Sequence, residues 1–175
     1  SNQDDDENDE QLRSVEVWNP QLNVWRPSPS FELVRSAHVG GVVGGSLVIA
    51  GGWGDDGGLA SAEAFNPAAG WTALPPMPHL SCYATAVELG GRLYVAGGGS
   101  CDKLQMWDGT AWTLKADLPA ERYKAASVAI DGKMWVIGGI GGGYGYTASA
   151  RIYERGTGSG PPREPGIESR SRDST

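Results

Sequence analysis

The chain has 175 residues, including 27 Gly, 11 Pro and 7 Trp, and a formal net charge of −7 at pH 7. Many glycine and turn residues among short apolar runs favour an all-β domain and exclude a disordered chain. Most of the excess negative charge lies in one acidic run, so the rest of the chain is almost neutral. Because no stretch is rich in Lys and Arg, we expect no nucleic-acid binding.

The two ends of the chain differ in composition from its middle. Residues 1–13 carry the acidic run DDDENDE, which is typical of a disordered, solvated arm or loop. Residues 154–175 are rich in Gly, Pro and Ser and have no apolar period, so we expect a disordered tail there. No stretch resembles a signal peptide or is apolar for long enough to span a bilayer, so we expect no membrane association.

Residues 14–153 contain an internal repeat. The apolar stretches SLVIAGG, RLYVAGG and KMWVIGG end in glycine pairs, at Gly52, Gly98 and Gly139. A Trp precedes the first glycine of each pair by 26 residues. The position ten residues after that Trp is occupied in turn by Arg35, Ser81 and Arg122. Several positions in step indicate one structural unit copied along the chain.

Each repeat is expected to form four short strands. Tight turns should join the first strand to the second, at Gly44-Gly45, Gly90-Gly91 and Asp131-Gly132. The second strand is almost continuously apolar, which predicts burial on both faces and therefore sheets packed against other sheets. In chain order we expect a partial unit, two full units and a partial unit, at residues 14–28, 29–76, 77–118 and 119–153.

The combined pattern resembles the kelch repeat: a double glycine after an apolar strand, an aromatic residue in VEVWNP and AEAFNP, a later Trp, then LPPMP and Arg. This resemblance implies a kelch-type β-propeller with about three four-stranded antiparallel blades. Closed propellers typically use about four to eight blades, so we expect an incomplete ring. The departures are Ser81, where the pattern has Arg, and QMWDG, which lacks an acidic residue before its aromatic.

Gly52, Gly54 and Gly57 also satisfy G-x-G-x-x-G, the spacing of dinucleotide-binding loops. However, an Asn-Pro pair follows too soon for an amphipathic helix, and no acidic residue lies about 20 residues on to bind a ribose. We therefore interpret these glycines as part of the repeat, where a neighbouring blade approaches closely, and we expect no cofactor.

The resemblance also implies a binding face. In kelch substrate receptors, arginines at the link between blades face the central cup and grip acidic peptides, a role that would fall here to Arg35 and Arg122. Other residues expected at this face flank the same links or lie in the loops after the second strands: Ser36, Trp53, Ser81, Tyr83, Tyr123 and Tyr144. In an alternative that the sequence leaves open, the two arginines only bridge blades through backbone carbonyls.

Other residues are assigned to packing or to no site. Trp25, Trp71 and Trp112 are expected to pack between blades. His79, Cys82 and Cys101 could meet as three zinc ligands, but His79 lies in a proline-rich connection, so we interpret them as two unrelated thiols and a loop histidine and expect no metal. Two cysteines form no disulfide framework, which favours a reducing compartment, the cytoplasm or nucleus.

We therefore interpret the chain as a protein-binding kelch module without catalytic residues. The resemblance suggests the substrate-recognition part of a ubiquitin-ligase adaptor. Two alternatives remain open: a fragment of a kelch-fold enzyme acting on sugars or small molecules, and a scaffold or actin-binding propeller.

Overall fold

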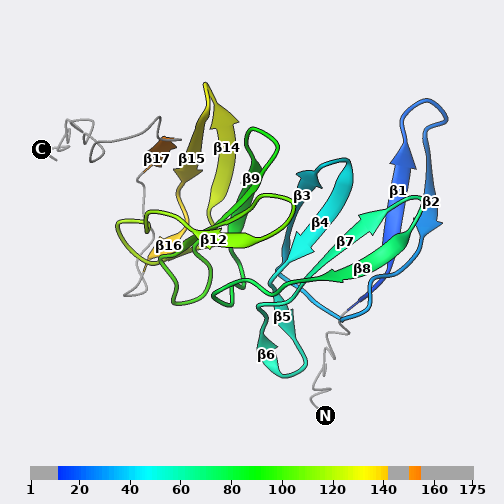
Figure 1. Cartoon of the computed structure of the whole chain (residues 1–175), viewed down its shortest axis with the longest axis horizontal. Helices are drawn as coiled ribbons and strands as arrows, with labels where there is room; N and C mark the ends of the chain where they lie inside the picture. Colours follow the sequence, from blue (N-terminus) through cyan, green and yellow to red (C-terminus); the bar gives the residue numbers. More distant parts are fainter. Residues whose placement is uncertain (1–11, 142–149, 155–175) are drawn as a thin grey trace, which may run out of the picture.

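The computed structural model describes residues 12–141 and 150–154, and in this part of the chain all regular structure is β-sheet. Figure 1 shows antiparallel sheets that follow one another across the molecule in chain order. The all-β, kelch-type fold class is thereby confirmed. The expected acidic arm and C-terminal tail lie almost wholly outside the described residues. Within the described residues, no helix is long and apolar enough to cross a membrane.

The first complete blade is a four-stranded antiparallel sheet of order β3-β4-β7-β8. Its strands are β3 (Val39–Val43), β4 (Ser46–Ala50), β7 (Ala62–Asn66) and β8 (Gly70–Leu74). Gly44 and Gly45 turn between β3 and β4 with φ of 59° and 79°, the doubly left-handed geometry of a tight hairpin. After β4, the strands β5 (Trp53–Gly54) and β6 (Gly57–Gly58) form a small hairpin, not the helix that a dinucleotide-binding loop requires.

The second complete blade repeats this topology. Its strands are β9 (Thr85–Glu88), β10 (Leu93–Ala96), β11 (Leu104–Trp107) and β12 (Trp112–Leu114), again paired in sequence order. The first strands of successive blades are neighbours, because β3 contacts β9 and β9 contacts β14 (Ala126–Ile130).

Smaller sheets flank the two complete blades. On the N-terminal side, β1 (Val15–Asn19) and β2 (Val24–Ser28) form a two-stranded sheet. On the C-terminal side, β14, β15 (Lys133–Ile137) and β17 (Ala150–Glu154) form a three-stranded sheet. The short strands β13 (Arg122–Tyr123) and β16 (Ile140–Gly141) pair beside it.

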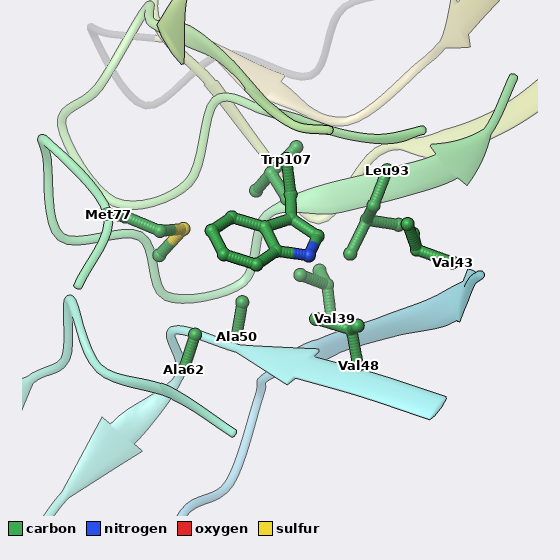
Figure 2. Close-up of a cluster of buried hydrophobic side chains, with 9 residues drawn as sticks. Val39, Val43, Val48, Ala50, Ala62, Met77, Leu93 and Trp107 are labelled. Atoms are coloured by element: carbon green, nitrogen blue, oxygen red, sulfur yellow. The ribbon is translucent and has the colours of Figure 1, made fainter. Parts of the chain in front are cut away.

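The core lies between neighbouring blades. Val39, Val48 and Ala50 of the first complete blade pack with Leu93 and Trp107 of the second (Figure 2). A second cluster joins the second complete blade to the sheet that follows. Because each fully buried aliphatic side chain contributes roughly 1.5–3 kcal/mol, the stacking of blades stabilises strands too short to form a core alone.

The glycine pairs allow close approach of the links on both sides, that of the same blade and that of the next. Gly52 N donates to Ser81 O at 2.7 Å and Gly98 N to Arg122 O at 2.8 Å, each across a blade boundary. A Cβ atom added at Gly97 would clash with Arg122 O of the next blade, and one added at Gly98 would lie 2.8 Å from Cys82 O in the link of its own blade, where the φ of 99° also disfavours any side chain. The pairs are therefore packing elements of the repeat.

The tryptophans differ in their environment. Trp71 Nε1 donates to Pro29 O at 2.7 Å and Trp112 Nε1 to Pro75 O at 3.0 Å, so each indole ties a fourth strand to the link that precedes its blade. The expectation for Trp25 is wrong, because its side chain is 69% exposed. Among the described residues, no sheet precedes β1 and β2 to cover it.

Candidate functional site

The links that lead into the first strands share an unusual backbone conformation. Ala37, Tyr83 and Lys124 have φ of 51°, 57° and 54°, left-handed values that cost non-glycine residues about 1–2 kcal/mol. Tyr83 N donates to Ala37 O at 3.0 Å, and Lys124 N donates to Tyr83 O at 2.7 Å. The links of three successive blades are therefore joined by backbone hydrogen bonds.

Exposed side chains gather along this row. Ser36 and Trp53 exchange backbone hydrogen bonds of 2.9 and 2.8 Å, which hold Trp53 beside the first link. The Trp53 and Tyr83 side chains are 46% and 43% exposed, and Lys124 Nζ lies 4.8 Å from the centroid of the Tyr83 ring. We call Ser36, Trp53, Tyr83 and Lys124 the link surface. It presents two aromatic rings, a hydroxyl and an ammonium on a fixed backbone.

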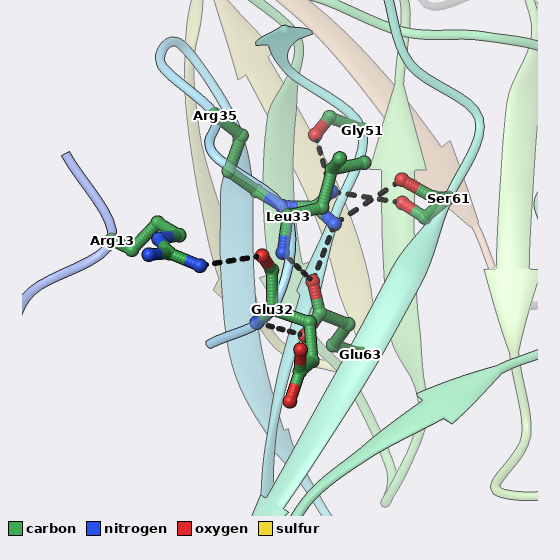
Figure 3. Close-up of polar contacts among 7 residues, drawn as sticks. All are labelled: Arg13, Glu32, Leu33, Arg35, Gly51, Ser61 and Glu63. Atoms are coloured by element: carbon green, nitrogen blue, oxygen red, sulfur yellow. Dashed lines mark hydrogen bonds and ion pairs between the residues drawn. The ribbon is translucent and has the colours of Figure 1, made fainter. Parts of the chain in front are cut away.

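Arg35 precedes this surface but lies inside the blade. It is 2% exposed, and Nη1 donates to Gly51 O at 2.8 Å and to Ser61 O at 3.0 Å. Nη2 donates to Glu63 Oε1 at 2.8 Å, and Glu63 also accepts the backbone N–H of Glu32 at 2.8 Å (Figure 3). The guanidinium thus joins the link to two strands of its own sheet.

The second complete blade has an uncharged counterpart. Ser81 Oγ donates to Gly97 O at 3.0 Å, as Arg35 does to Gly51 O. Gln105 lies at the register position of Glu63, accepts from His79 N at 2.8 Å, and donates to Ser81 Oγ at 3.2 Å. Both Ser81 and Gln105 are buried.

A groove of about 930 Å³ opens between β1 and the first complete blade. One wall carries Val15 and Glu16, and the other includes His38, Leu47 and Ile49, with Ser36, Trp53 and Tyr83 at the link end. Partial burial and the Arg35 guanidinium lower the pKa of His38, so its imidazole is neutral near pH 7. The groove is mainly apolar and continuous with the link surface.

Comparison with known proteins identifies the repeat. A family model described as "Kelch motif" matches residues 35–78. Kelch-like protein 35 of Mus musculus is 34% identical over 152 residues, covering 84% of this chain and 26% of that protein. Kelch-like protein 33 of Homo sapiens is 44% identical over 61 residues, covering 34% of this chain and 11% of that protein. Residues 35–78 therefore form a kelch motif, and the chain resembles Kelch-like protein 35 over 84% of its length.

The solved structure of YjhT shows the same fold. It superposes with a TM-score of 0.72 at 14% sequence identity, covering 83% of this chain and 50% of that one. This chain spans about a quarter, or less, of the length of the curated kelch relatives that it matches.

The kelch structure divides the predicted binding residues into two groups. Ser36, Trp53 and Tyr83 are exposed, and Tyr123 is half-buried, whereas the remaining described residues are buried: Arg35, Ser81 and Arg122. Tyr144 lies outside the described residues. The burial of Arg35 and Arg122 and their bonds to backbone carbonyls favour the alternative in which the arginines hold the backbone. Arg122 Nη1, like that of Arg35, donates to the carbonyl at the end of a second strand, Gly138 O, at 2.7 Å.

Lys124 is the residue of the link surface that sequence reasoning missed. It lies two residues after Arg122, as Tyr83 lies two residues after Ser81, so aligning the kelch repeats would have found it. Among the described residues, no three His, Cys, Asp or Glu side chains are grouped as metal ligands. Cys82 is buried, which raises the pKa of its thiol, and both cysteines are free.

Proposed function

We propose that this chain is a protein-binding kelch module and that its link surface contacts the partner. The observation that carries the proposal is the exposure of Tyr83 on a left-handed, hydrogen-bonded link, with the exposed Trp53 held beside the neighbouring link by its bonds to Ser36. Non-glycine residues in such conformations cluster at functional sites, because a fold retains the strain only where the surroundings impose it. Trp and Tyr are also the residues that most often anchor protein interfaces.

The chemistry of the surface favours a peptide segment as partner. The rings offer apolar area at little conformational cost. Lys124 supplies a positive charge for a carboxylate, whereas Arg35 and Arg122 fix the links that position it.

We propose further that the whole protein acts by binding rather than catalysis, as the substrate-recognition part of a ubiquitin-ligase adaptor in the cytoplasm or nucleus. The similarity to Kelch-like proteins supports this role.

The test is partner recovery with variants that leave the fold intact. Trp53→Ala and Tyr83→Asn remove the rings, and Asn tolerates the left-handed conformation at position 83. We expect each to lower affinity for a captured partner at least tenfold, while Leu114→Ala, at an exposed position on β12, leaves it unchanged. Equal binding by all three variants, with unchanged melting temperatures, would overturn the proposal.

A further inference from the structure

The two-stranded sheet β1-β2 corresponds to the third and fourth strands of a blade. Trp18 pairs with Trp25 as Phe65 pairs with Trp71 in the first complete blade. Asn19 Oδ1 accepts Gln21 N at 2.9 Å, and Asn66 Oδ1 accepts Ala68 N at 2.9 Å, so both turns begin with the same side-chain hydrogen bond. In this register Glu16 occupies the position of Glu63.

The counterpart of the second strand is not among the described residues. In the first complete blade, β7 pairs with β4 on one edge and β8 on the other, whereas β1 pairs only with β2. As a result Glu16 is exposed, although the matching Glu63 is 4% exposed and bound to Arg35.

The groove wall opposite β1 is an unfinished blade interface. Leu47 matches Leu93, which is fully buried because the hairpin of β3 and β4 packs on it, whereas Leu47 is only half-buried. Leu47 lines the groove. In the second complete blade the equivalent wall is covered by an apolar hairpin, β3 and β4 of the blade before it.

The backbone hydrogen bonds at the link end of the groove also indicate a missing neighbouring blade. Across each boundary between described blades, a link carbonyl accepts a glycine N–H, and a left-handed residue donates to the link before it. The matching groups of the first complete blade are Arg35 O and Ala37 N. The described residues supply no corresponding glycine N–H or link carbonyl for them.

We propose that the groove binds an arginine-led β-hairpin, the first and second strands of a further kelch repeat outside these 175 residues. Its second strand pairs with β1, its arginine bonds the Glu16 carboxylate, and its apolar side chains cover Leu47. The equivalent hairpins of this chain are already paired within their own sheets, so a second copy offers none. This interaction is separate from the proposed partner binding, because it depends on Glu16 rather than on Trp53 or Lys124.

The test adds a hairpin of known sequence to the full chain. A copy of residues 29–52 is fused directly ahead of residue 1, so that residues 1–14 form the connection, which is longer than the segment 51–61 between β4 and β7. Hydrogen exchange is then followed in β1. We expect exchange at residues 15–19 to slow at least tenfold relative to the unfused chain, with exchange in β10 unchanged.

Matched variants separate the specific contact from a general effect of fusion. Replacing the arginine of the added copy by Ala, or Glu16→Gln, should remove most of the protection, whereas Glu121→Gln, at an exposed acid outside the groove, should not. The proposal would be overturned if fusion left exchange in β1 unchanged. It would also be overturned if the protection were the same after replacement of the added arginine and of Glu16. Sedimentation showing a dimer of the unfused chain with β1 protected would also overturn it, because the occupant would then be a second copy.

Discussion

Ser81 and Gln105 form, in the second complete blade, the neutral equivalent of the Arg35–Glu63 ion pair in the first. The Gln105 Nε2 to Ser81 Oγ distance is 3.2 Å, and the Arg35 Nη2 to Glu63 Oε1 distance is 2.8 Å. In both blades the residue on the third strand also accepts a backbone N–H from the link. The repeat therefore requires a hydrogen-bonded bridge from link to third strand, and the bridge need not be charged.

The ion pair should be replaceable as a unit but not singly. Arg35→Ser alone leaves Glu63 buried and uncompensated, which should lower the free energy of unfolding by about 3–5 kcal/mol. Adding Glu63→Gln reproduces the chemistry of the second blade and should recover much of that loss. Urea denaturation of the two single variants and the double variant measures the coupling; additive losses would contradict the equivalence of the two bridges.

A side chain at a glycine pair should destabilise the fold through close contacts that a hairpin glycine does not make. At Gly98 an added Cβ would lie 2.9 Å from Ala84 Cβ and 2.8 Å from Cys82 O, whereas at Gly91 it would meet nothing within 4 Å. Gly98→Ala should cost more than about 2 kcal/mol, and Gly91→Ala about 1–2 kcal/mol from its positive φ alone. Thermal unfolding compares the two, and equal costs would show that close approach is unimportant.

Asp108 gives the second blade a predictable pH dependence. Its carboxylate accepts the backbone N–H groups of Ala111 and Thr110 and the Thr110 hydroxyl, which lower its pKa to about 2. Because the folded pKa is lowered from 3.8, the stabilisation is complete above that value and is lost as the pH falls through about 2. Carboxyl titration by NMR measures this pKa; a value at or above 3.8 would refute the turn geometry.

The sequence predicted the blades well because their signals are local and periodic. Glycine pairs, hairpin turns such as Asp131-Gly132 and apolar second strands each report on a few neighbouring residues. The burial of Arg35 could not be predicted in this way, because it depends on Ser61 and Glu63, which lie next to and in another strand. Trp25 was misjudged for the same reason, since its exposure depends on whether a sheet covers it.

Site-specific cross-linking tests the central claim, that partner recognition uses the link surface, most directly. A photoreactive phenylalanine analogue is placed at Tyr83, and in a matched protein at Leu114 on the exposed fourth strand β12. We expect cross-links to a protein partner from position 83 and none from position 114. Cross-links from position 114 alone would place the partner on the outer strands and contradict the account.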